Sequence, residues 1–214
     1  MHSHPMSHLL LLILTAPVTY ELDASKTELI ALLAPGGLPG LAHPHVVVAS
    51  QVTGSIVWDA ESPAGSSVKL TFPTSGLRAD DANLRKRESM GELSDKQREE
   101  INGNMRDEDQ LSPKLFPNIS FASTSVKPAA DGTLEVKGKL SIRGVEKELT
   151  MPVTVKEKDG QFIGTGNAVI RHTDFKFKPY SAALGAVKNQ DEITLKVRLV
   201  GNRAAEKKAD APSP

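Results

Sequence analysis

Three internal histidines have the spacing to do chemistry. His43 and His45 stand two residues apart, so their imidazoles point to the same side of an extended chain, and His172 is a third donor. Imidazole nitrogen is a ligand that zinc and iron accept, so a metal-dependent enzyme using His43, His45 and His172 is one hypothesis. The alternatives are contact with the head group of a ligand, or a structural role through hydrogen bonds to carbonyl groups.

Arg171 is a further candidate for a polar contact. With Asp174, it follows an apolar segment that ends at Ile170. A guanidinium at the rim of a binding site could hold a polar head group. The alternative is an ion pair at the end of a strand, which has little energetic weight when it is exposed.

Sequence motifs of the common catalytic sites are absent. The chain has no Gly-x-Ser-x-Gly, no His-Glu-x-x-His and no glycine-rich phosphate loop. It has no cysteine, which excludes thiolate nucleophiles, disulfides and cysteine metal sites. Lys plus Arg equals Asp plus Glu at 26 each, so nothing in the charge favours nucleic acid. We therefore expect a protein that is not an enzyme, needs no cofactor and does not bind nucleic acid.

Apolar and polar residues alternate in the segments that must position these groups, which is typical of strands with one buried face. The apolar positions are Ile56 and Trp58; Val68, Leu70 and Phe72; Ile119 and Phe121; Leu134, Val136, Leu140 and Ile142; Leu149, Met151, Val153 and Val155; and Ile193, Leu195, Val197 and Leu199. The same alternation places Lys139 and Lys196 on the solvent face. Asp131-Gly132, Arg143-Gly144 and Asp159-Gly160 mark turns between strands.

One insertion, residues 80–109, is highly charged and lacks the strand pattern. Ser94 followed by Gln97 predicts a capping box and a helix that runs to about Asn102. Its few apolar residues indicate a surface helix on a rim or over an opening. The remaining pattern predicts an all-β fold of about eight antiparallel strands, which suits a sandwich or a barrel wide enough for one small ligand.

The two ends of the sequence differ from the middle. Leu9–Val18 is an apolar run too short to span a bilayer as a helix, which needs about 20 residues. We interpret residues 1–19 as a signal peptide or an N-terminal extension, so we expect a periplasmic or secreted protein, or a cytoplasmic one if the segment is retained. Residues 201–214 hold no large apolar side chain and are interpreted as a solvated tail.

Four groups of residues together resemble the YceI-like family. They are Gly40–Ala49 with Gly54–Ile56; Asn104–Leu111 with Phe116–Ser123; Gly138–Val145 with Met151–Val153; and Phe175–Ser181 with Leu184–Val187 and Asp191–Ile193. Each is weak alone, but their order and spacing are specific, and the likeness runs from about Tyr20 to Val200. Members often read Gly-His-Asp-His where this chain has Ala42-His43-Pro44-His45, and Phe-Gly where it has Phe175-Lys176. Both departures lie where a barrel mouth is expected.

The resemblance implies a lipocalin-like barrel over residues 20–200 that holds a polyisoprenoid or similar amphiphilic lipid and carries no catalytic residue. The residues expected to line it are Trp58, Leu70, Phe72, Phe121, Leu140, Ile142, Met151, Val153, Phe162, Leu195 and Val197. His43, His45 and Arg171 are the candidates for the mouth and head group. We hypothesise a lipid carrier with transient membrane contact and a role in the envelope stress response. The rival hypotheses are the metal-dependent enzyme and an interaction or stress protein with a filled core.

Overall fold

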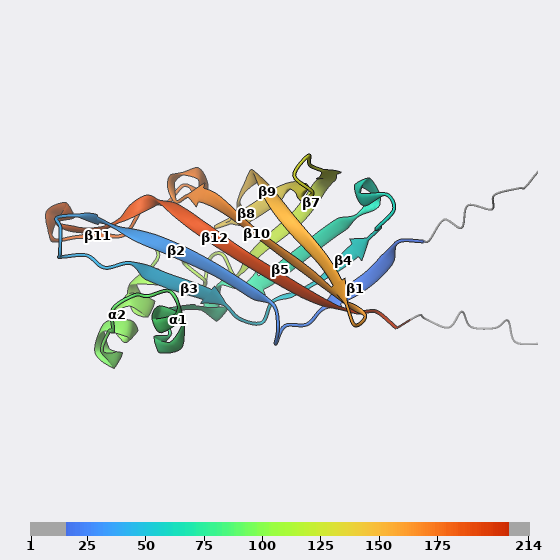
Figure 1. Cartoon of the computed structure of the whole chain (residues 1–214). Coiled ribbons are helices and arrows are strands. Elements are labelled where there is room, and N and C mark those ends of the chain that lie inside the picture. Colours follow the sequence, from blue (N-terminus) through green and yellow to red (C-terminus); the bar gives the residue numbers. More distant parts are fainter. Residues whose placement is uncertain (1–15, 206–214) are drawn as a thin grey trace, which may run out of the picture.

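The structure is a computed structural model that describes residues 16–205 (Figure 1). Most of the predicted signal peptide and most of the predicted tail lie outside the described residues. The periplasmic or secreted location, which depends on Leu9–Val18, therefore stays a prediction. Within the described part, no helix has the length and apolar character needed to cross a membrane.

The predicted all-β fold is confirmed. The strands are β1 (Val18–Leu22), β2 (Glu28–Gly37), β3 (His45–Ala49), β4 (Thr53–Trp58), β5 (Ser67–Pro73), β6 (Leu77–Ala79), β7 (Asn118–Pro128), β8 (Leu134–Ile142), β9 (Val145–Lys158), β10 (Gln161–Arg171), β11 (Ser181–Ala182) and β12 (Val187–Arg203). The α-helices are α1 (Ala82–Arg87) and α2 (Asp95–Met105). Short 3-10 turns cover Pro63–Gly65, Thr74–Gly76, Thr173–Phe175 and Ala183–Gly185.

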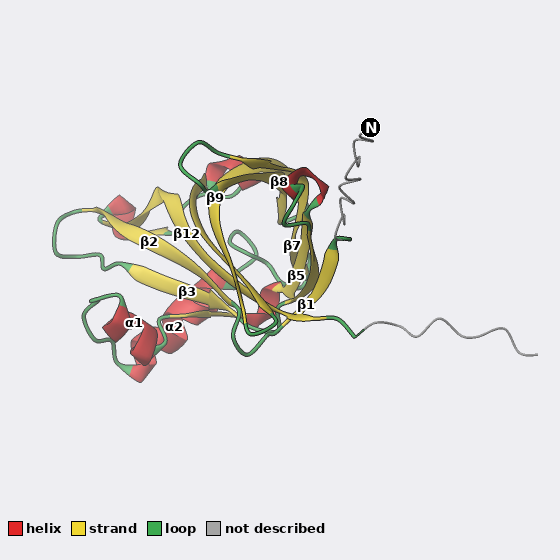
Figure 2. Ribbon diagram, turned by 45° about the vertical axis from the view of Figure 1, so that its right-hand side comes forward, coloured by secondary structure: helices red, strands yellow, loops and turns green. Residues whose placement is uncertain are grey.

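Eight of these strands close into an antiparallel barrel, visible as a ring in Figure 2. The order around the ring is β1, β4, β5, β7, β8, β9, β10 and β12, and the pairing of β1 with β12 closes it. Leu22 lies opposite Gly201 and Tyr20 opposite Arg203 at this closure. Because the eight strands form a closed ring, the predicted barrel of about eight strands is confirmed. The closed ring leaves no free strand edge within it.

Three further strands extend the wall beyond the ring. The first part of β12, Val187–Arg198, pairs with β2, which continues into β3 and then β6. This extension and the two helices lie together at one end of the molecule, on the left in Figure 1, while β1 and the described ends of the chain lie at the other. The extension lengthens the tube on the side of the helices.

Helix α2 covers the free edge of β6. The side-chain amide of Asn102 accepts a hydrogen bond from the Ala79 backbone N–H (2.9 Å) and donates one to the Ala79 carbonyl (3.0 Å). A guanidinium nitrogen of Arg106 lies 3.4 Å from the Leu77 carbonyl on the same edge. The predicted capping box of Ser94 and Gln97 is present, although the helix ends at Met105 rather than at Asn102.

The predicted turns connect the strands as expected. In Arg143-Gly144 both residues have positive φ, 53° and 69°, and in Asp159-Gly160 the values are 52° and 74°. Two residues with positive φ are what a tight hairpin needs to match the right-handed twist of its strands. These turns set the registers of β8 with β9 and of β9 with β10.

The barrel begins and ends slightly outside the predicted range of 20–200. Strand β1 starts at Val18, and β12 continues to Arg203, so Gly201–Arg203 belong to the barrel rather than to the tail. These three residues lack apolar side chains to bury, but their backbone groups pair with β1 and β10. Ladder hydrogen bonds, which the side-chain pattern does not reveal, account for the difference.

A buried ion pair in the charged insertion was not predicted. Asp80 and Arg85 are 0 % and 2 % exposed, and their Oδ1 and Nη1 atoms are 2.7 Å apart. Arg85 also donates to the carbonyls of Pro44 (2.9 Å) and Gly91 (2.7 Å). The charged run Arg85–Glu100, expected to be a solvated helical face, is therefore not solvated at Arg85, and this residue and Asp80 fasten the insertion to the start of β3.

Replacing Arg85 by alanine should destabilise the protein strongly. The change leaves the Asp80 carboxylate buried without its guanidinium partner, and breaking a buried pair in this way typically costs about 3–5 kcal/mol. The measurement is the free energy of unfolding in urea. Arg171→Ala is the control, because Arg171 forms an exposed pair with Glu192 and its loss should cost less than about 1 kcal/mol. Equal losses in the two variants would contradict a structural role for the buried pair.

Candidate functional site

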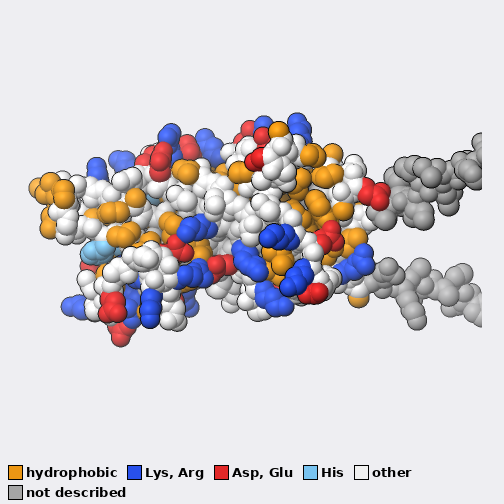
Figure 3. Space-filling model, in the orientation of Figure 1, with side chains coloured by type: hydrophobic (Ala, Val, Ile, Leu, Met, Phe, Trp, Pro, Cys, Tyr) orange, Lys and Arg blue, Asp and Glu red, His pale blue; other side chains and the backbone are white. Residues whose placement is uncertain are grey.

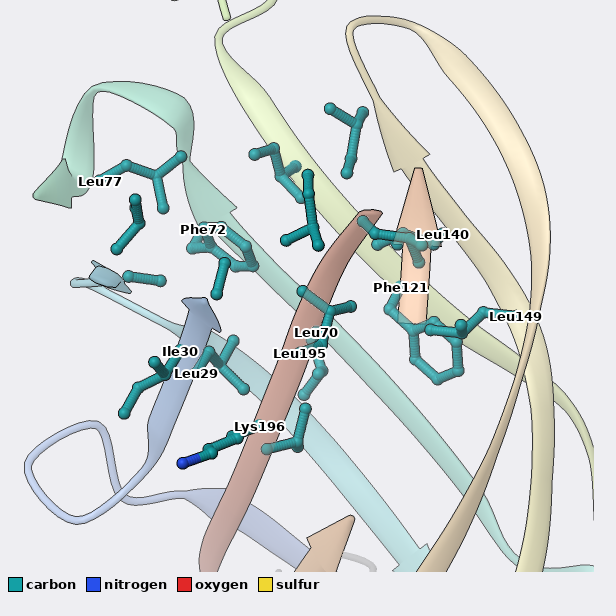
Figure 4. Close-up of a pocket in the computed structure, with 18 of the residues that line it drawn as sticks. Leu29, Ile30, Leu70, Phe72, Leu77, Phe121, Leu140, Leu149, Leu195 and Lys196 are labelled. Carbon is teal, nitrogen blue, oxygen red and sulfur yellow. The ribbon is translucent and has the colours of Figure 1, made fainter. Parts of the chain in front are cut away.

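The interior of the barrel contains a cavity of about 490 Å³. This volume is in the range of sites that hold small organic ligands, roughly 300–1,000 Å³. Figure 4 shows side chains from β2, β5, β7, β8, β9 and β12 converging on it, among them Leu29, Phe72, Phe121 and Leu195. Most lining side chains are aliphatic or aromatic, so the cavity offers dispersion and hydrophobic contact.

All eleven residues expected to line the interior do line this cavity: Trp58, Leu70, Phe72, Phe121, Leu140, Ile142, Met151, Val153, Phe162, Leu195 and Val197. The reason is the period of two, which sends every second side chain of a strand inward. Whether any of them contacts a ligand stays a prediction. The sequence pattern missed the contribution of β2 and β3, whose lining residues include Leu29, Leu33 and Val47. Every position of Leu29–Leu33 is apolar, so alternation could not tell which face is inward.

Two glycines make room for large side chains inside the barrel. A Cβ atom at Gly138 would lie 2.4 Å from the Phe121 ring, on the neighbouring strand. A Cβ atom at Gly166 would lie 2.8 Å from the sulfur of Met151. Both distances are too short for real contacts, so these positions require glycine for the inward side chains to keep their places. The glycines therefore help to set the shape of the cavity wall.

Aromatic side chains pack together at the end of the cavity near β1. The rings of Tyr20 and Trp58 each lie 5.7 Å from the ring of Phe162, between centroids. Glu157 joins two of them, because it accepts hydrogen bonds from the Tyr20 hydroxyl (3.0 Å) and the Trp58 indole (2.6 Å). This aromatic end was not predicted as a unit, since its members are far apart in the sequence.

The opposite end of the cavity, at α2, is polar. One face of α2 contributes Gln97, Glu100, Ile101, Asn104 and Met105 to the lining. These residues are three or four apart, which places them on one side of a helix. The helix predicted on a rim or over an opening thus lies against the cavity. The spacing was present in the sequence, but most of these residues are polar and so gave no apolar stripe.

Tyr180 and Asn189 join α2 at this polar end. The Asn104 side-chain amide lies 3.1 Å from the Tyr180 hydroxyl. The backbone N–H of Asn189 donates to the Tyr180 carbonyl (3.0 Å). Both residues line the cavity, as does Gln110 in the loop after α2. Uncharged donors and acceptors therefore surround this opening, together with the carboxylate of Glu100.

His43 and His45 also line the cavity, and their rings lie 5.8 Å apart. His45 is tied to the buried ion pair, because its Nδ1 donates to Asp80 Oδ2 at 2.6 Å. Burial alone would raise the pKa of the Asp80 carboxyl. The hydrogen bond and charge of His45, with hydrogen bonds from Val46 and Arg85, outweigh burial and hold that pKa below its ordinary value. Asp80 is therefore an acceptor that fixes His45 at the wall of the cavity.

The three histidines do not form a metal site. Among residues 16–205, no three His, Cys, Asp or Glu side chains gather closely enough to hold a metal ion. His172 lines the cavity separately, with its Nδ1 donating to the Asp191 carbonyl (2.8 Å) and its ring against Phe177. Burial lowers the pKa of His172 below its ordinary value, although the hydrogen bond to Asp191 opposes the shift. The neutral imidazole is thus favoured inside the barrel.

Of two positively charged residues, Arg171 follows one of its two predicted alternatives and Lys196 differs from expectation. Arg171 does not line the cavity; its guanidinium forms an exposed ion pair at the end of a strand, with Glu192 at 3.0 Å. Lys196 was placed on the solvent face, but it is only half exposed, borders the cavity and pairs with Glu88 at 2.6 Å. Residues near the end of α1 reach the outer side of β12 and cover this lysine, which a strand pattern alone could not foresee.

A charge placed inside the barrel should destabilise it. Leu140 is 8 % exposed, so Leu140→Asp would bury an unpaired carboxylate at a cost of about 3 kcal/mol or more. Lys139→Asp changes the exposed neighbouring residue and should cost less than about 1 kcal/mol. Urea unfolding of both variants checks this. Similar losses would contradict the inward orientation of Leu140.

The lowered pKa of His172 predicts loss of stability in mild acid. The unfolded chain binds the proton at about pH 6.5, before the folded state does, so stability should fall as the pH decreases below 6.5 toward the folded pKa. The size is about 1.4 kcal/mol for each unit by which the two pKa values differ. Thermal unfolding at pH 7.5 and 5.5 measures it. His172→Gln should lose less stability over this interval, and an unchanged loss would assign the effect to other groups.

Comparisons with known proteins agree with this architecture. A UPF0312 protein of Pseudomonas putida is 29% identical over 101 residues, which cover 47% of this chain and 44% of the relative. Protein YceI of Escherichia coli is 30% identical over 114 residues, covering 53% and 47%. The chain thus matches less than half the length of these curated relatives.

Solved structures with low sequence identity share the fold. Burkholderia cenocepacia BcnA has a TM-score of 0.64 and 21% identity, over 84% of this chain and 98% of that one. The Campylobacter jejuni YCEI protein has a TM-score of 0.56 and 17% identity, over 74% and 85%. The model of the YceI-like domain matches residues 20–201, which is nearly the whole barrel. The chain therefore belongs to the YceI-like domain family.

Proposed function

We propose that the barrel binds and carries an apolar, isoprenoid-type lipid and does not change it chemically. The observation that carries this proposal is the cavity of about 490 Å³, whose wall is built from inward aliphatic and aromatic side chains. These aliphatic and aromatic side chains provide no nucleophile and no acid–base pair, and the polar groups of the wall, such as Glu100 and Tyr180, suit hydrogen bonds to a head group. The aromatic end near β1 suits the end of a hydrocarbon chain, and the polar end at α2 suits a head group.

The energetics favour reversible carrying over permanent capture. Burying one CH₂ group from water is worth about 0.8 kcal/mol, so a five-carbon isoprene unit contributes roughly 4 kcal/mol gross. In a cell, however, the competing environment is the bilayer, where the same lipid is already shielded from water. The net free energy of transfer from membrane to barrel is therefore small, and the lipid can be both taken up and released.

The polar end favours a head group without negative charge. Glu100 supplies a carboxylate there, and Asn104, Tyr180 and Asn189 supply uncharged donors and acceptors. Among the described lining residues, Lys196 is the only lysine or arginine, and Glu88 neutralises it. A phosphate would meet a carboxylate and no free cation, whereas a hydroxyl or carbonyl group could be hydrogen-bonded. We therefore expect an uncharged, hydrogen-bonding head group.

Native mass spectrometry of the protein purified from a bacterial host tests the proposal. We expect a co-purifying lipid of several hundred daltons, and its extraction should identify an isoprenoid chain without phosphate. Leu195→Trp fills the cavity and should lose the lipid, whereas Val169→Trp introduces the same side chain at an exposed position and should keep it.

Several outcomes would contradict the proposal. Spectra that stay empty, or a lipid that persists in Leu195→Trp, would argue against binding in the cavity. A bound polyisoprenyl phosphate would refute the expected head group but not the site. A stoichiometric metal lost on His43→Ala would instead support the alternative of a metal-dependent enzyme.

A further inference from the structure

Exposed leucines gather at the end of the barrel that carries the extension. Leu38 and Leu41, in the loop between β2 and β3, are 58 % and 52 % exposed, and Leu184, in the turn after β11, is 110 % exposed. We call these three residues the leucine tip. Figure 3 shows hydrophobic side chains covering this end of the molecule, on the left beyond β11. Clustered apolar residues at an exposed end indicate a binding surface, whereas single ones do not.

The two segments of the leucine tip are held together and join the cavity. The Leu38 N–H donates to the Ala186 carbonyl (2.9 Å), and Gly37 pairs with Val187. Ala42 directly follows Leu41, and both Ala42 and Val187 line the cavity. The residues that follow the tip along the chain therefore form part of the cavity wall. The leucine tip lies next to the polar end of the cavity.

The backbone of the tip holds Leu184 outward in an unfavourable conformation. Ala183 and Leu184 have φ angles of 49° and 55°. Residues with a Cβ atom rarely adopt positive φ, and such conformations persist where the surrounding structure enforces them, often at functional sites. A fully exposed leucine held in this conformation does not contribute to the core. Its conformation and exposure together point to contact with something outside the chain.

The charge of the tip segments complements an anionic surface. Residues 34–44 contain no Asp or Glu, and residues 175–190 contain Lys176, Lys178 and Lys188 but no Asp or Glu, in a chain of zero net charge. Acidic residues 107–109 lie nearby, because Gln110 donates to the Lys178 carbonyl (3.3 Å). The positive charge is therefore confined to the tip segments themselves.

We propose that the leucine tip docks on the surface of an anionic phospholipid bilayer. The three leucines insert at the level of the head groups, the lysines face the lipid phosphates, and the mouth of the cavity lies against the membrane. Docking of this kind would let an apolar ligand pass between bilayer and barrel without crossing water. This inference goes beyond the binding of a lipid in the cavity, because docking can be measured whether or not the cavity is loaded.

Co-sedimentation with vesicles of phosphatidylcholine and phosphatidylglycerol at 7:3 tests the inference with the full chain. We expect the wild type to bind, and the triple variant Leu38→Ser, Leu41→Ser, Leu184→Ser to bind about tenfold more weakly. Raising the salt concentration should weaken wild-type binding only in part. The matched control is Leu115→Ser with Val169→Ser, which removes leucine and valine side chains of similar exposure, 61 % and 56 %, outside the tip and should bind as the wild type does.

Leu184→Gly separates docking from folding. Glycine tolerates the positive φ, so this variant should unfold no earlier than the wild type, yet it should bind vesicles more weakly. Equal binding by wild type, triple variant and control would overturn the inference, as would absence of wild-type binding. Concentration-dependent self-association that the triple variant abolishes, without vesicle binding, would overturn it in favour of a second copy of this chain. If the triple variant loses vesicle binding but still co-purifies with the cavity lipid, the proposed carrier function remains intact.

Discussion

One edge of strand β12 pairs with two different strands, β1 and β2, and the rest of the structure depends on this shared edge. Its final residues pair with β1 and close the ring, while its first part, Val187–Arg198, pairs with β2 and starts the extension. Its other edge pairs with β10 along eleven residues. A strand of this length can therefore belong to a closed barrel and to an open sheet at once. Both the ring and the open sheet therefore contribute side chains to the wall of the cavity.

The different character of the two ends follows from this arrangement. Near β1 the ring is complete, and Tyr20, Trp58 and Phe162 pack together there. Toward α2 the wall depends on loops, a helix and short strands, which bring polar side chains and a buried ion pair. Asp80 and Arg85 hold that part in place by contacting the backbone around β3. The cavity wall therefore changes from apolar to polar along its length.

The sequence predicted the inward face of the ring because alternation is local. Residues such as Phe121, Leu140 and Leu195 could be assigned from their immediate neighbours. The same reasoning failed where contacts between distant parts of the sequence set the burial of a side chain. Lys196 is predicted to be solvated from its strand pattern, but the chain near the end of α1 packs against it. Asp80 and Arg85 look like ordinary surface charges, since nothing nearby in the sequence shows that Pro44 and His45 will enclose them. The polar face of α2 was hidden for a similar reason, because its role comes from what it faces.

The amide of Asn102 has a consequence for how copies of this protein meet. Strand β6 is the last in its sheet. The unpaired backbone groups of an edge strand can form hydrogen bonds with a strand of a second polypeptide. Asn102 occupies both backbone groups of Ala79, and Arg106 reaches the carbonyl two residues earlier. Helix α2 therefore takes the place of a neighbouring strand along the edge of β6. By occupying backbone groups of Leu77 and Ala79, the helix that lines the cavity also hinders edge-to-edge pairing between copies of this protein.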